Sequence, residues 1–181
     1  MNLYSLDLHG CSISNISLTA FSGLESLRTL KLSSNSLGEV PSLQLAGLVR
    51  LEELSLGRNY IQVLPDRAFQ GLRKLRLLDL SESPSLALVS SAALQDNSAL
   101  AWLSVSGCAS LSLQSGALLH LTSLRTVHLA DLGWSGVDRD LLQWQNIHTL
   151  DLGYNPLNCD CKVAWLREVV VQATNTSRYN L

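Results

Sequence analysis

Two cysteines near the C-terminal end are the residues whose spacing first suggests chemistry. Cys159 and Cys161 stand one residue apart, before an apolar run, and the other two cysteines, Cys11 and Cys108, lie far upstream. A Cys-x-Cys pair serves a metal clip, a redox couple or half of a disulfide framework. A metal clip needs two further ligands, and the nearest histidine, His148, comes with no second cysteine pair. A redox couple needs an electropositive setting in a thioredoxin-like frame.

The histidines form no catalytic constellation in the sequence. All four fall in different segments of the chain, at His9, His120, His128 and His148. No nucleophile with a matched base and orienting group accompanies them, and Gly-rich phosphate loops are missing. We therefore expect a protein that is not an enzyme, with no cofactor and no metal ion.

Composition indicates one folded domain without an obvious charged partner. The 181 residues carry a net charge of −2, with 46% hydrophobic and 15% charged residues. The 13 Lys and Arg residues give no electrostatic case for nucleic acid or for an anionic membrane surface. Apolar stretches stay shorter than the ~20 residues of a membrane helix. The opening residues, MNLYSLDLHG, lack the pattern of a signal peptide.

A leucine pattern, L-x-x-L-x-L, recurs along the whole chain. Its seven copies follow one another at spacings of 24, 24, 24, 25, 24 and 23 residues. They start at Leu3, Leu27, Leu51, Leu75, Leu100, Leu124 and Ile147. Six residues before the second to seventh starts stand Phe21, Leu45, Phe69, Leu94, Leu118 and Leu141. Each copy predicts a short strand with its leucines inward, and stacked copies pair these strands into one parallel sheet.

A polar residue recurs three residues after the last leucine of the pattern in several copies, and we call this position the asparagine register. Asn35, Asn59 and Asn155 occupy it, and a buried amide there can bond the turn backbone of neighbouring repeats. Cys11 and Cys108 replace the asparagine in the first and fifth repeats. We interpret them as small substitutes within the ladder, and we expect both to be buried, reduced and too far apart to pair.

The pattern is typical of a leucine-rich repeat solenoid. It predicts an α/β fold, a right-handed horseshoe with a parallel concave β-sheet, an irregular convex side and a C-terminal capping helix. Residues 1–157 comprise seven repeats, of which the first lacks an N-terminal cap, and residues 158–181 form a partial cap. The amphipathic run from Lys162 to Gln172, with Trp165 and Leu166 on its apolar side, is the expected capping helix.

The stretch NPLNCDCKVAWL, from Asn155, resembles the start of the C-terminal cysteine-rich cap of extracellular leucine-rich repeat proteins. This family includes Slit-like, Toll-like, Trk-like and neuronal adhesion receptors. The register of NYIQVLPDRAFQGLRKLRLLDL, from Asn59, matches it too, and the resemblance covers essentially the whole chain. It implies that Cys159 and Cys161 each bond a cysteine further along the cap. Because no cysteine follows them before Leu181, we expect the chain to be a fragment of a longer protein.

Disulfide caps and two glycosylation sequons favour an extracellular or cell-surface location. The sequons are at Asn15, on the loop after the first strand, and at Asn175. We expect no direct membrane contact in this chain and a parent protein anchored in a membrane.

One part of the outward sheet face has the composition of an interface. Leu77 and Trp102 hold the same position in consecutive repeats, which predicts exposed neighbours ~5 Å apart. Arg76 and Arg125 flank them, and His128 lies on the next strand. A solvated face, or a Trp102 folded over the sheet, is the competing interpretation.

These observations predict protein–protein recognition through the concave face, in the ectodomain of a cell-surface adhesion or signalling receptor. The partner would be a protein ligand or a co-receptor, and not a nucleic acid. The alternatives are an innate-immune receptor, Toll-like or lymphocyte-type, and the accessory repeat domain of a secreted matrix protein. Fold alone does not choose among them.

Overall fold

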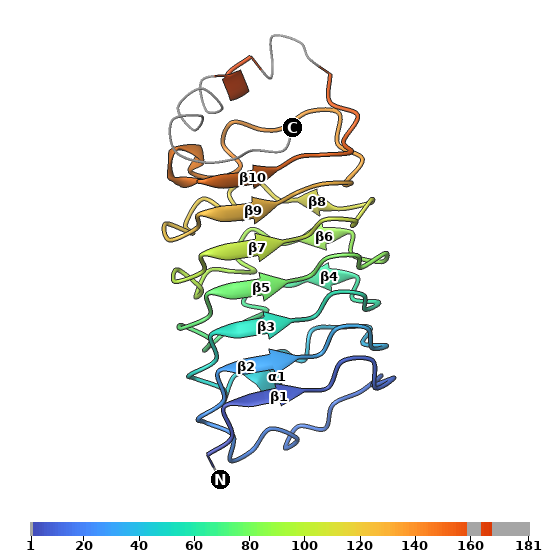
Figure 1. Ribbon diagram of the computed structural model, residues 1–181, viewed down its shortest axis with the longest axis vertical. Helices are drawn as coiled ribbons and strands as arrows, with labels where there is room; N and C mark the ends of the chain where they lie inside the picture. The colour runs from blue at the N-terminus through green and yellow to red at the C-terminus, as the bar shows by residue number, and fades with distance from the viewer. Residues whose placement is uncertain (1, 159–163, 168–181) are drawn as a thin grey trace.

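The computed structural model describes residues 2–158 and 164–167. Within these residues, seven short strands form one parallel sheet along one side of an elongated stack (Figure 1). In sheet order they are β1 (Ser5–Asp7), β2 (Thr29–Lys31), β3 (Glu53–Ser55), β5 (Leu77–Asp79), β7 (Trp102–Ser104), β9 (Thr126–His128) and β10 (Thr149–Asp151). Each repeat contributes one strand, so the predicted solenoid is confirmed.

The inward leucines of these strands form continuous buried columns. Leu30, Leu54 and Leu78 are direct partners in neighbouring strands, and none of them is exposed to solvent. The strands end after three residues because the chain turns away from the sheet at a left-handed position just before the asparagine register. Positive φ angles occur there at Ser34, Arg58, Glu82, Gly107, Asp131 and Tyr154. The same turn in repeat after repeat keeps the stack in register.

A second, smaller parallel sheet lies on another side of the stack. In the described part of the chain it contains β4 (Val63–Leu64), β6 (Leu88–Val89) and β8 (Ser112–Leu113). The third to fifth repeats each place a two-residue extended segment here, whereas the sixth places none next to β8. These three repeats therefore have regular structure on that side, which the sequence pattern does not predict.

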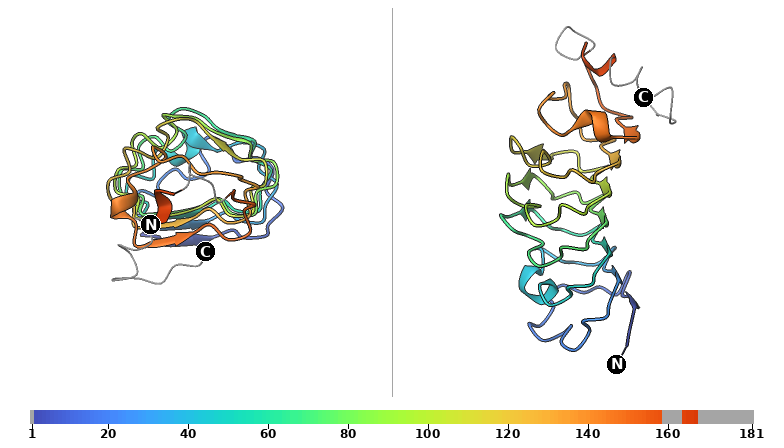
Figure 2. Two further views of the ribbon diagram at one scale, coloured as in Figure 1. Left: turned by 90° about the horizontal axis from the view of Figure 1, so that it is seen from above. Right: turned by 90° about the vertical axis from the view of Figure 1, so that its left-hand side faces the viewer.

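The core lies between the main sheet and the returning half of each repeat. Viewed along the stack, the repeats superimpose as nearly closed rings (Figure 2). The apolar residues that stand six positions before each repeat start form a register that fills the inside of these rings. Leu45, Phe69 and Leu94 belong to it and are at most 1% exposed. The helix α1 (Ser42–Leu45) carries Leu45 of this register, and the 3-10 helix η1 (Trp144–Asn146) carries the buried Trp144 three residues after Leu141. Burial of these apolar side chains in a continuous column holds the repeats together.

The two ends of the stack differ. At the first repeat, Leu3, Leu6 and Leu8 are only half-buried, since no repeat among the described residues packs on their outer side. At the other end, the ring of Trp165 lies 5.0 Å from the ring of Trp144 and packs against the core. The remainder of the predicted capping helix lies outside the described residues. No helix in the described residues is long and apolar enough to cross a bilayer.

The asparagine register forms a buried hydrogen-bond ladder, as predicted. The Asn59 amide nitrogen donates to the carbonyl oxygens of Leu32 at 3.0 Å and Leu56 at 2.8 Å, and its oxygen accepts the Leu37 N–H at 3.0 Å. The Asn35 side chain repeats this pattern one repeat earlier. Each amide thereby ties its own turn to the preceding repeat.

The two cysteines in this register differ, and one prediction is wrong. Cys108 is fully buried, and its Sγ donates to the Leu80 carbonyl at 3.5 Å, in the manner of an asparagine. Burial raises the pKa of this thiol to about 11. Cys11 is exposed rather than buried, and its Sγ donates only to the nearby His9 carbonyl. Within the described residues, no repeat covers this position from the outer side.

Candidate functional site

The outward faces of the main strands bring the predicted interface residues together. We call Arg76, Leu77, Trp102, Arg125 and His128 the Trp102 patch. Leu77 and Trp102 are direct partners of β5 and β7, so the predicted adjacency is confirmed. Both side chains are half-buried, however, and not fully exposed. The parallel register makes this contact inevitable, because it places equivalent positions of consecutive repeats side by side.

The side of Trp102 that faces away from Leu77 is covered by His128. The Trp102 and His128 rings lie with centroids 5.3 Å apart at an angle of 48°. On the other side of His128, its Nδ1 is 3.7 Å from Oδ2 of Asp151 on β10. Trp102 therefore presents part of its ring to solvent and rests the rest on the imidazole. Such a rigid, half-exposed aromatic group is typical of an interface anchor.

The two arginines of the patch flank the small side chain of Ala101. Backbone bonds run from the Ala101 N–H to the Arg76 carbonyl at 2.8 Å and from the Arg125 N–H to the Ala101 carbonyl at 3.0 Å. Arg76 is exposed. Arg125 is half-buried, and its Nη1 donates to the carbonyls of Thr122 at 2.9 Å and Leu124 at 2.8 Å. One cation is thus free to move, and the other is fixed in place.

Elsewhere on the sheet face, cations pair with acids of the neighbouring repeat. Arg28 bonds Glu52 at 2.8 Å, and Lys31 lies 3.3 Å from Asp7. The His9 backbone N–H and then Lys31 hold the pKa of the Asp7 carboxyl below its ordinary value. Within the described residues neither arginine of the Trp102 patch has such a partner. The patch therefore presents two arginines without an ion-pair partner in the described chain, beside an apolar surface.

The structure aligns a serine, a histidine and an aspartate that the sequence analysis did not connect. Ser104, His128 and Asp151 occupy the same position in β7, β9 and β10, an order that resembles a serine–histidine–aspartate triad. The His128–Asp151 separation of 3.7 Å is too long for a hydrogen bond. Ser104 is only 5% exposed, and no hydrogen bond links it to His128 in the described chain. The alignment lacks the nucleophile–base contact that acyl transfer needs. Spacings of 24 and 23 residues between polar strand positions were the available signal.

Of the remaining predicted site residues, the structure describes Asn15 alone. Asn15 is exposed on the loop after β1, where a glycan has access. Cys159, Cys161 and Asn175 lie outside the described residues. Among the described residues there is no group of three or more His, Cys, Asp or Glu side chains that could hold a metal ion.

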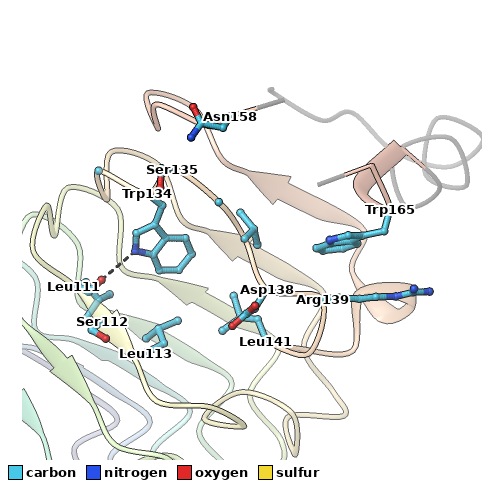
Figure 3. A pocket seen from close by; sticks show the side chains of 13 residues that line it. Leu111, Ser112, Leu113, Trp134, Ser135, Asp138, Arg139, Leu141, Asn158 and Trp165 are labelled. Carbon is cyan, nitrogen blue, oxygen red and sulfur yellow. Dashed lines mark hydrogen bonds between the residues drawn. The ribbon is translucent and has the colours of Figure 1, made fainter. Parts of the chain in front are cut away.

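A hollow of about 960 Å³ opens near the C-terminal end, away from the Trp102 patch (Figure 3). It lies beside the edge of β8, where the irregular sixth repeat supplies no further strand. The indole N–H of Trp134 donates to the Leu111 carbonyl at 3.0 Å and occupies part of this space. Asp138 and Trp165 line other parts of the hollow. Among the described residues, Asp138 and Arg139 are the titratable side chains that line it.

Comparisons with known proteins agree with this architecture. The family model described as "Leucine rich repeat" matches residues 1–61 and 49–109. No curated protein matches the chain in sequence. The solved structure of human 5T4 (Wnt-activated inhibitory factor 1, trophoblast glycoprotein) has a TM-score of 0.69 at 26% identity, over 83% of this chain and 58% of that one.

The TLR13–ssRNA13 complex is a second similar structure, with a TM-score of 0.65 at 21% identity, over 98% of this chain and 36% of that one. This chain thus spans 58% and 36% of the two solved chains. The RNA in the second structure does not fit the expectation that the partner is never a nucleic acid. At 21% identity the likeness shows the fold alone. Because a protein with this fold is seen in complex with RNA, the fold by itself does not exclude RNA as a partner.

Proposed function

Because the chain belongs to the leucine-rich repeat family, we propose that it recognises a protein partner through the Trp102 patch, as part of the ectodomain of a cell-surface adhesion or signalling receptor. The family's repeat domains generally bind proteins, and extended sheet faces are the surfaces that they use. The single observation that carries the proposal is the patch itself. It combines a half-exposed tryptophan, an apolar neighbour and two arginines that form no ion pair with an acid in the part of the chain that the structure describes.

The composition of the patch supports a protein partner. Tryptophan and arginine are the residues most enriched at interface hot spots, and they contribute most when they are fixed in place. Trp102 rests on His128, and the Arg125 guanidinium is held by two carbonyls, so both lose little freedom on binding.

An extracellular setting follows as part of the proposal. The exposed Asn15 sequon and the resemblance of NPLNCDCKVAWL, from Asn155, to the start of a cysteine-rich cap support it, and so does the likeness to human 5T4. We propose that Cys159 and Cys161 pair with later cysteines of that cap and that the parent protein is membrane-anchored. The chain carries out no reaction in this proposal and needs no cofactor.

An innate-immune receptor is the second candidate, and the likeness to the TLR13 fold favours it. A net charge of −2 does not support a phosphate-binding surface, since nucleic-acid binding proteins neutralise many phosphates with Lys and Arg. We therefore place this candidate second.

The proposal is tested by screening the folded chain against an array of purified ectodomains, in parallel with Trp102→Ala and Tyr154→Ala. Tyr154 is 92% exposed on a turn and provides a matched aromatic control. We expect a partner whose affinity falls at least tenfold for Trp102→Ala and stays unchanged for Tyr154→Ala. Leu77→Gln provides an independent second variant, and urea unfolding confirms that each variant folds. A partner that binds all variants equally would place recognition elsewhere and refute the proposal.

Glycan attachment at Asn15, on which the extracellular proposal partly rests, is measured separately. Expression of the chain behind a secretory leader in mammalian cells should give a product whose mass falls on treatment with an N-glycosidase. Asn15→Gln should remove part of that difference. A secreted chain that carries no glycan at Asn15 would argue against the extracellular assignment.

A further inference from the structure

The charges around Trp102 specify more than a general binding face. Arg76, Ala101, Arg125 and His148 follow one another across four consecutive repeats, joined by backbone bonds from Ala101 to Arg76, from Arg125 to Ala101 and from His148 to Arg125. Two strand spacings, about 10 Å, separate the two arginine backbones. The small alanine between them leaves room above the sheet for the exposed Arg76 side chain, whereas the Arg125 guanidinium is held at its own end of the patch by the carbonyls of Thr122 and Leu124.

The acids on the other border of the patch are already occupied. Asp79 accepts from the Ser81 backbone N–H at 3.0 Å and from the Ser81 hydroxyl at 2.6 Å. Asp151 accepts the Gly153 N–H at 3.0 Å and faces His128. The border formed by Arg76 and Arg125 is thus positive, whereas the opposite border carries acids with local partners.

From this arrangement we infer that the Trp102 patch binds an acidic segment of a partner protein, with carboxylates between Arg76 and Arg125 and an apolar side chain on Leu77 and Trp102. The inference rests on the proposed function and specifies the chemistry of its partner. Arginine is suited to this role because its planar guanidinium binds a carboxylate through two parallel hydrogen bonds. The apolar contact alongside excludes water and strengthens those bonds.

A protein segment fits this surface better than a nucleic acid does. A nucleic-acid site needs a track of cations along the backbone, with aromatic platforms for the bases. Here Glu52 is the neighbour of Arg76 in the preceding repeat. Glu53 and Asp79 lie on the same sheet face. These acids would repel a phosphate chain that continued past the two arginines, but they allow a short acidic segment.

The test is a selection of phage-displayed 12-residue peptides on the whole immobilised chain, on Arg76→Glu and on Arg73→Glu. Arg76 is exposed and has no ion-pair partner among the described residues, so its reversal does not remove an internal bond. Arg73 is exposed three positions away, outside the strand, and is the matched control. We expect wild type and Arg73→Glu to enrich peptides with Asp or Glu beside an aromatic or aliphatic residue.

A synthetic peptide from the wild-type pool should then bind Arg76→Glu at least tenfold more weakly. Its affinity for wild type should fall with rising ionic strength more steeply than its affinity for the variant. Peptides that bind Arg76→Glu as tightly as wild type, or that show no acidic enrichment, would overturn the inference.

Trp102→Ala separates this inference from the proposed function. If the selected peptides require Trp102 but ignore Arg76, recognition through the patch stands and the acidic partner is wrong. If they ignore both residues, the proposed function fails as well. Single-stranded RNA that displaces the peptide in an Arg76-dependent manner would replace the acidic segment with a nucleic acid and would also overturn the inference.

Discussion

Replacing Asn59 by alanine tests whether the buried ladder holds neighbouring repeats together. Asn59 is 1% exposed and serves both the preceding repeat and its own turn. The Leu32 carbonyl keeps a second donor, the Asn35 amide, at 2.9 Å. The Leu37 N–H and the Leu56 carbonyl have Asn59 as their hydrogen-bond partner in the described chain. Alanine would therefore leave one donor and one acceptor buried without partners.

Each buried polar group without a partner costs about 1–3 kcal/mol. Two such groups predict a loss of about 2–6 kcal/mol in the free energy of unfolding for Asn59→Ala. A loss of about 3 kcal/mol would lower Tm by roughly 6–12 °C in a chain of this size. Urea unfolding followed by tryptophan fluorescence measures the loss. The exposed Gln62→Ala is the control and should change stability by less than about 0.5 kcal/mol.

Two further substitutions distinguish hydrogen bonding from simple loss of volume. Asn59→Cys should lose less than alanine, because Cys108 occupies this register in the fifth repeat and donates to a carbonyl. Asn59→Asp should lose more, since its carboxylate cannot donate to the carbonyls that surround it. If Asn59→Ala is as stable as Gln62→Ala, or if aspartate is tolerated, the ladder does not stabilise the stack and our reasoning is wrong.

Three other predictions concern the cysteines and one glycine. In a Cys159→Ser, Cys161→Ser background, a thiol reagent should label exposed Cys11 quickly and buried Cys108 only after unfolding; prompt labelling of both would contradict the burial. The pKa of the Cys108 thiol rises from 9.0 to about 11 on folding, so the folded chain keeps a proton that the unfolded chain loses. Stability should therefore fall between about pH 9 and pH 11, by up to about 1.4 kcal/mol per pH unit, and urea unfolding of Cys108→Ala should show a shallower slope. A Cβ at Gly57 would lie 2.7 Å from the Ser81 carbonyl oxygen, whereas one at Gly38 would meet open space. Thermal unfolding should therefore show a loss of about 1–3 kcal/mol in the free energy of unfolding for Gly57→Ala, and almost none for the control Gly38→Ala.

The sequence by itself determined the stack and most of its core. A leucine pattern with a period near 24 residues predicts which side chains point inward, because strand alternation and parallel stacking leave one arrangement that buries them all. The same logic predicts that Leu77 and Trp102 touch. It places Asn59 in a buried ladder as well, since equivalent positions of consecutive repeats become neighbours.

Only the tertiary structure decided how those neighbours share space and solvent. Cys11 and Cys108 have the same place in the repeat, yet one is exposed and the other buried, because burial depends on a repeat that covers the position from outside. The half-buried Trp102 ring and the fixed Arg125 guanidinium likewise follow from side-chain contacts with His128 and from turn carbonyls. A periodic pattern specifies which residues meet, but rotamers and local hydrogen bonds determine which of them remain available to a partner.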